Sequence, residues 1–230
     1  MTRLPLWRYR LVGLLVAAVA VVVSARPASA DVILGAVAGT INAGGPGAGG
    51  SIPGTFDQSG LSSNYVSGVT DFDAYLATGP VHSIDFLLEW FSNEGTTSAS
   101  VTYDLGAVYN IGRVALWNED ASGIGLLSLF GSTDNVSFAP LLLDISPTNN
   151  PIEVDYGPDV LQFAATDLRY VMFEMGDCPQ PDAGAFPSCA IGEVAFAATA
   201  PGVPEPASAA LLALGVSAVA VVRRRRLHRG

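Results

Sequence analysis

Two apolar segments, one near each end of the chain, limit the part of this sequence that can fold as a compact domain. Residues 11–24 follow an Arg-rich start, and residues 207–222 run directly into a cluster of Arg. These segments help to raise the hydrophobic content to 50% and the mean hydropathy to +0.40. Such a composition excludes an intrinsically disordered chain. Residues 31–200 remain between them, and they suffice for one domain with a sizeable hydrophobic core.

The charge of the chain is as unevenly distributed as its apolar residues. The whole sequence has a net charge of −10, and all of its basic residues other than His are Arg. Residues 31–200 hold two Arg and 20 Asp or Glu, so their charge is 2 − 20 = −18. Nucleic acid binding by counterion release requires Lys and Arg facing phosphates. The central domain is therefore predicted to bind no nucleic acid, and its sign favours divalent cations.

The N-terminus has the three parts of a secretory signal peptide. A basic start precedes the apolar run at residues 11–24, and Ala28 and Ala30 form an A-x-A cleavage site before Asp31. The alternative is a membrane anchor that is retained, but a run of 14 residues is short for a span of about 20. We therefore predict a signal peptide over residues 1–30.

The C-terminus carries three features in a fixed order. Val203, Pro204, Glu205 and Pro206 come first, and the two prolines keep this stretch extended. A 16-residue apolar run at 207–222 follows, which as a helix spans about 24 Å and predicts a transmembrane helix. Arg223, Arg224, Arg225 and Arg226 come last and are expected to stay in the cytoplasm.

This order resembles the PEP-CTERM sorting signal of exopolysaccharide-producing Gram-negative bacteria. The resemblance implies recognition by the membrane protease exosortase, after passage through the secretion machinery. It also implies an inner-membrane intermediate, loss of the tail, and release or attachment at the cell surface. The alternative is an ordinary C-terminal membrane anchor.

The central part shows the pattern of an all-β protein. Short runs rich in Val, Tyr, Phe and Leu recur between clusters of Gly, Asn, Asp and Pro, and no segment sustains a 3.6-residue amphipathic period. Strands are predicted at residues 98–104, 110–117, 126–131, 136–143, 160–164, 168–175 and 191–197. The Gly-rich tract at 44–50 is predicted to be a mobile loop and not a phosphate cradle, since neither a helix pattern nor Lys follows it.

Three blocks in the central part occur in an ordered set. Their shared positions are Asp104-Leu105-Gly106, Ile111, Val114, Leu116, Trp117, Ser132, Asp134, Phe138, Arg169-Tyr170-Val171 and Glu193-Val194. This set resembles the discoidin, or coagulation factor 5/8 type C, domains of the galactose-binding-like superfamily. The resemblance implies a jelly-roll β-sandwich over residues 55–198.

These features predict six segments along the chain. A signal peptide (1–30) and a Gly-rich N-terminal segment (31–54) precede the sandwich (55–198). A linker with the VPEP motif (199–206), a transmembrane helix (207–222) and an Arg-rich cytoplasmic tail (223–230) follow it.

The two cysteines and the two central arginines have structural interpretations. Cys178 and Cys189 are the only cysteines of an exported chain, so a disulfide between them is expected. Arg113 and Arg169 are the only cations besides His in the −18 domain, and each is expected to pair with an acid, Asp104 being one candidate.

Calcium is the cofactor that the sequence makes credible. Asp71 and Asp73 lie two apart in a Gly-containing loop and offer hard oxygen ligands. The discoidin resemblance implies a structural calcium in a loop before the Asp104 strand, closed by the acid of the last strand, Glu193. The alternative is that these acids are solvated and cap a turn.

Carbohydrate binding is the commonest task that the resemblance implies. Sugar sites need aromatic faces beside polar groups, and Tyr65, Tyr75, Trp90 and Phe91 are the candidates, although Trp90 could equally anchor the core. The predicted function is a non-catalytic binding module for extracellular polysaccharide on the cell surface or in the extracellular matrix. The alternative is a structural or adhesion protein that binds protein partners or itself.

Little in the sequence favours catalysis. His82 is the only His of the central part, and a glycan-active hydrolase would have to use it with Asp85 and some Ser. No G-x-S-x-G nucleophile motif occurs. We therefore predict no enzymatic activity, with the hydrolase as a third interpretation.

Overall fold

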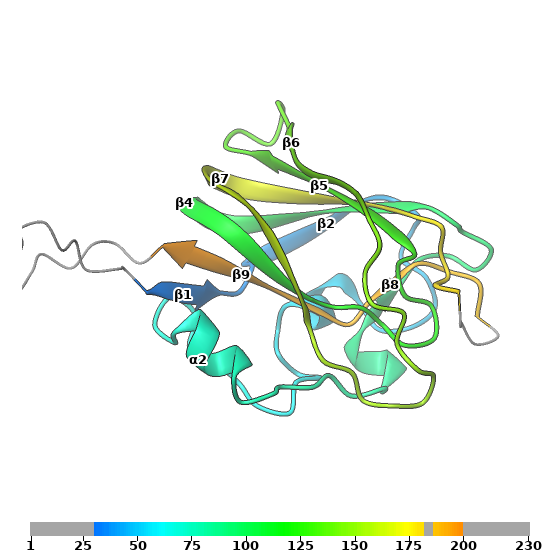
Figure 1. The fold of residues 1–230 in the computed structure, drawn as a ribbon. Coiled ribbons are helices and arrows are strands. Elements are labelled where there is room, and N and C mark those ends of the chain that lie inside the picture. The colour runs from blue at the N-terminus through cyan, green and yellow to red at the C-terminus, as the bar shows by residue number, and fades with distance from the viewer. Residues whose placement is uncertain (1–29, 182–185, 200–230) are drawn as a thin grey trace, which may run out of the picture. The chain divides into compact units, whose positions relative to one another are not determined.

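A computed structural model of the chain describes residues 30–181 and 186–199 (Figure 1). The predictions for Ala28, for the VPEP motif, for the apolar run at 207–222 and for the Arg cluster at 223–226 lie outside the described residues. Within them, no helix has both the length and the apolar character needed to cross a membrane.

Antiparallel β-strands are the main regular structure of the described domain (Figure 1). Their bounds are β1 (Asp31–Leu34), β2 (Ala38–Ala43), β3 (Trp90–Phe91), β4 (Ala99–Trp117), β5 (Leu126–Ser132), β6 (Ala139–Ile145), β7 (Asp159–Gly176), β8 (Ala190–Ile191) and β9 (Glu193–Thr199). Seven strands are hydrogen-bonded in the order β1-β9-β4-β7-β5-β6, with β2 also paired to β4. Strands β3 and β8 form a separate pair.

Strands β4 and β7 are long enough to take part in both layers of a sandwich, at 19 and 18 residues. The first part of β4 pairs with β2 and with the end of β7, whereas its last part pairs with β9 and with the start of β7. Register shifts between Asp104 and Tyr109, and between Ile111 and Arg113, separate these parts. The all-β sandwich predicted from the sequence is confirmed.

The main core lies between the two layers. Tyr103 of β4 is fully buried, and its ring centroid lies 5.2 Å from that of Phe173 and 6.1 Å from that of Phe196. These two rings come from β7 and β9, so one aromatic side chain joins both layers. The hydroxyl of Tyr103 is 2.9 Å from Thr55 Oγ1, which satisfies its buried oxygen.

Loops and the short helix α2 (Phe72–Leu76) cover the outer face of β9 and of the last part of β4. The 3₁₀ helix η1 (Ile52–Thr55) packs instead against the main core through Ile52, and the 3₁₀ helix η2 (Phe86–Leu88) lies close to η1. A second buried cluster forms under α2, in which Trp117 and Ala195 of the sheet belong together with Phe72 and Tyr75 of α2. Strand β9 is therefore buried on both faces.

The sheet begins earlier than the sequence predicted. We expected residues 31–54 to precede the sandwich, but β1 pairs with β9 and β2 pairs with β4, which extends the sheet to Asp31. The DVIL segment of β1 is only four residues long, and the AGTINA segment of β2 consists mostly of small and polar residues. Neither provides a clear strand pattern.

The two central arginines form the expected ion pairs. Arg169 Nε lies 2.9 Å from Asp104 Oδ1. Arg113 lies 2.7 Å from Asp31 Oδ2 and 2.6 Å from Asp73 Oδ1. Hydrogen bonds from the guanidinium groups lower the pKa values of the Asp73 and Asp104 carboxyls.

Candidate functional site

A pocket of about 500 Å³ opens beside strand β3. Most of its wall is apolar: Ala48, Gly49, Ile84, Phe86, Phe91, Ala121, Ile152 and Phe186. The rings of Phe91 and Phe186 meet edge to face, with centroids 5.9 Å apart. Carboxylates of Glu119, Asp120 and Glu153 complete the wall. The pocket thus combines aromatic surfaces with hydrogen-bond acceptors.

The Gly-rich tract forms one side of this pocket. A Cβ atom at Gly47 would lie 2.0 Å from the Phe91 carbonyl oxygen, and one at Gly50 would lie 1.8 Å from the Glu89 carbonyl oxygen. Both glycines have positive φ angles. The tract therefore packs tightly against the backbone of residues 89–91, where we had expected a mobile loop.

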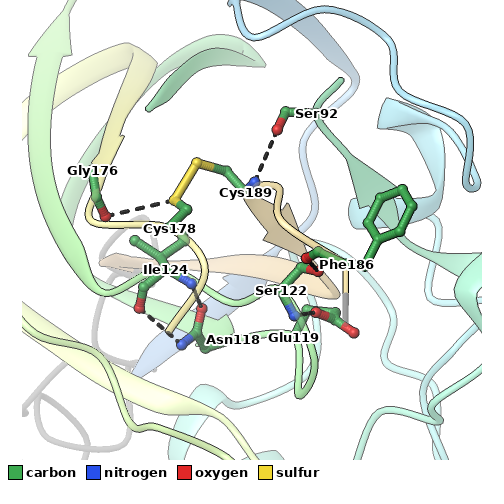
Figure 2. The surroundings of a disulfide bond; sticks show 9 residues. All are labelled: Ser92, Asn118, Glu119, Ser122, Ile124, Gly176, Cys178, Phe186 and Cys189. Carbon is green, nitrogen blue, oxygen red and sulfur yellow. Dashed lines mark hydrogen bonds between the residues drawn. A yellow bond between two sulfur atoms is a disulfide. The ribbon is translucent and has the colours of Figure 1, made fainter. Parts of the chain in front are cut away.

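The predicted disulfide joins Cys178 to Cys189, which follows Phe186 of the pocket wall by three residues (Figure 2). Cys178 and Cys189 are bonded, with their Cα atoms 5.0 Å apart, and the Cys189 N–H donates to Ser92 Oγ at 2.9 Å. The Ser122 hydroxyl donates to the Phe186 carbonyl at 2.7 Å. Figure 2 shows Phe186 held beside the loop that carries Glu119.

Buried amide side chains hold that loop, which connects β4 to β5. Asn118 Oδ1 accepts the Ile124 N–H at 2.7 Å, and Asn118 Nδ2 donates to the Thr148 carbonyl at 2.9 Å. Gln180 Nε2 donates to the Asp120 carbonyl. These bonds use backbone groups that would otherwise be buried without partners, and they make the loop a rigid support.

Three acidic side chains meet at the base of the pocket. Glu89, Glu119 and Asp120 each offer a carboxylate oxygen within 4.8 Å of the others. All three are buried. Both arginines of the described residues are engaged with other acids, so no Arg neutralises this group there. Buried carboxylates without a counter-ion are costly, and the cluster could hold a metal ion.

Glu89 is oriented by two neighbours. Its Oε1 accepts a hydrogen bond from the Tyr156 hydroxyl at 2.7 Å and lies 3.5 Å from His82 Nδ1. Its Oε2 is buried and has no hydrogen-bond partner. Burial and the nearby Glu89 charge raise the pKa of Tyr156 well above its usual value. Tyr156 therefore acts as a hydrogen-bond donor that fixes one oxygen of Glu89 and leaves the other free.

The surroundings of Glu119 disfavour the ionised form of its carboxyl. Its Oε2 accepts hydrogen bonds from the backbone N–H groups of Ala121, at 3.0 Å, and Ser122. Burial raises the pKa of Glu119 to about 8, and repulsion by Glu89 adds to this effect. At neutral pH this carboxyl favours a proton unless a cation compensates its charge.

The predicted calcium residues have different partners. Asp71 caps α2 by accepting the Ala74 N–H at 2.7 Å, and Asp73 is paired with Arg113. Glu193 is buried at the start of β9, and its Oε2 accepts the Gln58 N–H at 3.2 Å. Burial raises the pKa of Glu193 well above its usual value. Among the described residues, the acids grouped as potential metal ligands are those of the pocket and not Asp71, Asp73 and Glu193.

The predicted sugar-binding aromatics fall into two groups. Phe91 lines the pocket. Tyr65 and Tyr75 are buried and contact each other edge to face in the cluster under α2, and Trp90 is fully buried in the main core. Of these four residues, only Phe91 therefore lies at the pocket.

Sequence reasoning did not single out the acidic residues of the pocket. Glu89 directly precedes the buried Trp90-Phe91 pair, and Glu119 and Asp120 directly follow the apolar end of β4. The signal in the sequence that could have pointed to these acids is that they stand directly beside buried strands. They resemble ordinary turn residues, however, and 30 positions separate Glu89 from Glu119, so only the fold brings them together.

His82, on which the hydrolase interpretation depended, lies behind the pocket. It is fully buried, stacks on Tyr156 with ring centroids 5.5 Å apart, and its Nδ1 lies 2.7 Å from the Ser83 carbonyl. A general base must reach its substrate. The structure gives the hydrolase interpretation no support at this residue.

The C-terminal signal can be compared with known protein families. Residues 202–226 match the PEP-CTERM protein-sorting motif. The match contains the VPEP sequence and the apolar run, confirms the predicted sorting motif, and indicates a secreted protein. It covers the tail alone and says nothing of the sandwich. Among curated proteins, none matches the chain.

Solved structures similar to the chain are carbohydrate-binding modules. A mutant of chitosan-binding module 1 from a chitosanase/glucanase of Paenibacillus sp. IK-5 is 17% identical, with a TM-score of 0.47 over 74% of this chain and 98% of that chain. The CBM32 of AlyQ, in complex with 4,5-unsaturated mannuronic acid, is 16% identical, with a TM-score of 0.43 and coverages of 71% and 96%.

A third similar structure is CpGH89CBM32-5 from Clostridium perfringens, in complex with GalNAc-β-1,3-galactose. It is 15% identical, with a TM-score of 0.44 and coverages of 69% and 93%. Because these identities are below 25% and these TM-scores are below 0.5, we infer no ligand or binding residue from the three structures.

Proposed function

We propose that this protein is an exported, non-catalytic binding module that takes a segment of extracellular polysaccharide into the pocket beside β3. One observation carries the proposal: apolar ring faces and carboxylates line the same pocket. Phe86, Phe91 and Phe186 supply the rings, and Glu119 and Asp120 supply the acceptors. Sugars present apolar C–H faces and hydroxyl donors, which match these two kinds of surface.

The size and setting of the pocket fit this proposal. A volume of about 500 Å³ lies within the usual range for small-molecule sites, roughly 300–1,000 Å³. The wall is preformed, because the glycine tract, the disulfide and the amide network hold its parts. A preformed pocket loses little conformational entropy when a glycan binds.

Export would bring the pocket into contact with polysaccharide outside the cell. The sorting motif at 202–226 supports processing by exosortase in a Gram-negative bacterium, followed by residence at the cell surface or in the extracellular matrix. An inner-membrane intermediate held by the C-terminal helix would precede that processing.

Exposed apolar side chains beside the pocket favour a second candidate function. Ile84, Phe86 and Leu87 are 43%, 55% and 62% exposed and lie in or next to η2. An apolar patch of this kind can also bind a protein partner or a second copy of the chain. Adhesion through η2 is therefore the alternative to glycan binding.

A glycan array separates the two candidates. Phe86→Ala removes an exposed ring from the pocket, and we expect it to reduce glycan binding about tenfold or more with little loss of stability. Leu143→Ala is the matched control, because Leu143 is also 55% exposed and lies on β6, away from the pocket lining. If the wild type bound no glycan but self-associated, and Phe86→Ala abolished that association, the adhesion function would replace glycan binding.

A further inference from the structure

We propose that Glu89, Glu119 and Asp120 form a binding site for a divalent hard cation, with Ca²⁺ as the ion it takes outside the cell. Carboxylate oxygens are the donors that hard cations prefer. The site differs from the one expected at Asp71, Asp73 and Glu193. It concerns the cation alone and does not require that a glycan binds.

The spacing of the three carboxylates admits such an ion. Their oxygens lie within 4.8 Å of one another. Ca²⁺–oxygen bonds are about 2.3–2.6 Å long, so two ligands on opposite sides of the ion stand about 5 Å apart. One ion can therefore contact all three side chains without a change of fold.

The free oxygen of Glu89 is a second and independent indication of a ligand. Glu89 is fully buried, and its Oε2 has no hydrogen-bond partner, although Tyr156 and His82 lie close to Oε1. Buried polar atoms without a partner are rare because each costs free energy. A cation between the carboxylates would supply that partner, and Tyr156 would orient Glu89 as an outer-shell donor commonly does.

The backbone around the cluster is arranged for carboxylate ligands. Glu119 Oε2 accepts two backbone N–H groups, and Asp120 Oδ2 accepts the Glu153 N–H at 2.7 Å. Each of these side chains thus has one oxygen fixed by the backbone. Since Glu119 and Asp120 also line the pocket, ions can reach the cluster from solvent.

The alternative acids are less available to an ion. Asp73 is held by Arg113 through two hydrogen bonds, and Asp71 caps α2. A cation at either residue would have to replace a partner that the chain already provides. The pocket cluster has no arginine partner among the described residues.

Calorimetry with ions alone tests the site. The full-length protein is treated with EDTA, dialysed and titrated with CaCl2, and its melting temperature is followed in parallel. We expect one site with a Kd of about 10⁻⁴–10⁻³ M, as in extracellular calcium modules, and a rise in melting temperature. Glu119→Gln and Asp120→Asn should each weaken binding about tenfold or more.

Two carboxylate-to-amide variants elsewhere serve as controls. Asp71→Asn and Glu193→Gln should keep the wild-type affinity within about twofold. In EDTA, Glu119→Gln should melt at the same temperature as the wild type or higher, because the amide oxygen still accepts the two N–H groups and the amide places no charge beside Glu89. A purely structural Glu119 would instead make this variant melt lower.

Three results would overturn the proposal. The first is a wild type that binds none of Ca²⁺, Mg²⁺ or Mn²⁺. The second is unchanged affinity in the double variant Glu119→Gln, Asp120→Asn. The third is a loss of binding in Asp71→Asn or Glu193→Gln as large as that in Glu119→Gln, which would place the ion in the other acidic region.

Discussion

The acidic side chains of this domain occur in two contrasting regions. On β1, α2 and β4, Asp31, Asp73 and Asp104 each contact an arginine and remain partly or largely exposed. At the base of the pocket, Glu89 and Glu119 are buried beside each other, away from both described arginines. The first arrangement lowers the pKa of Asp73 and Asp104, and the second raises that of Glu119.

The difference shows that a net charge of −18 in the central segment is not one uniform property. Ion pairs at the surface contribute little to stability, but they also leave little unbalanced charge. The buried acids concentrate unbalanced charge at one point, and buried charge without compensation is usually found where a protein binds something. The arginine-paired acids are therefore interpreted as structural, and the pocket acids as functional.

The largest effect should come from releasing the support of the pocket. Replacing both cysteines, as Cys178→Ser with Cys189→Ser, opens a loop with a sequence separation of 11. We expect a loss of about 3 kcal/mol in the free energy of unfolding, measured by urea denaturation. Binding at the pocket should weaken with it, because Phe186 lies inside this loop.

The surface ion pairs serve as the internal control for the cysteine-free variant. Asp104→Asn should keep its small effect in the cysteine-free background, since the two sites share no partner. A combined variant with all three substitutions whose losses did not add would contradict the separation of the two regions.

The pH dependence of stability should have opposite signs in the two regions. Glu119 has a pKa of about 8 in the folded protein, above its unfolded value, so the folded state binds more protons and stability falls as pH rises from about 4.5 to 8. Buried Glu193 acts in the same direction. Thermal melts in EDTA should show the slope, and Glu119→Gln should flatten it.

Asp104, whose pKa is lowered by Arg169, provides the comparison for that measurement. Asp104→Asn should leave the slope between pH 5 and 8 unchanged, because Asp104 titrates below this range. An equal slope in the wild type and in Glu119→Gln would mean that the pocket acids are not responsible.

The smallest effect is expected at the surface ion pair of β4 and β7. Asp104 has a lowered pKa because Arg169 donates hydrogen bonds to it. Its contribution is complete above its unfolded pKa, near 4, and is lost as pH falls through the folded value. Asp104→Asn should therefore cost about 0.5–1 kcal/mol at pH 7, and this cost should shrink as pH falls below 4, measured by urea denaturation. Because an Asn side-chain oxygen can still accept the Gly106 N–H, a cost that did not shrink at low pH would mean that the charge of Asp104 is not what the pair contributes.

Much of the fold could be predicted from the sequence because its signals are local. The Val, Tyr and Leu runs of β4 and β7 show where strands occur, and the two cysteines of an exported chain predict their disulfide. That β4 continues as one strand could not be predicted, because residues 105–109 at the change of layer show no strand pattern of their own. Strands β1 and β2 gain their order from β9 and β4, which are remote in sequence.

The site was much less predictable. Tyr65, Tyr75 and Trp90 have the residue types of a sugar site, but the same types fill cores, and burial decides between the two roles. Phe86 and Phe186 line one pocket although 100 positions separate them, so only the fold brings them together. Asp71 and Asp73 form a conspicuous local pattern, yet a helix cap and an arginine account for their contacts.

The pairing of β1 with β9 fixes where the first and last strands lie relative to the pocket. Asp31 lies opposite Thr199, so the chain enters and leaves the sandwich at neighbouring points, whereas Glu193, at the other end of β9, lies opposite Trp117 and next to the loop of Glu119 (Figure 1). Seven residues of extended strand, about 20 Å, separate the exit from the pocket region. The pocket region therefore lies at the end of β9 that is remote from Thr199, the last described residue.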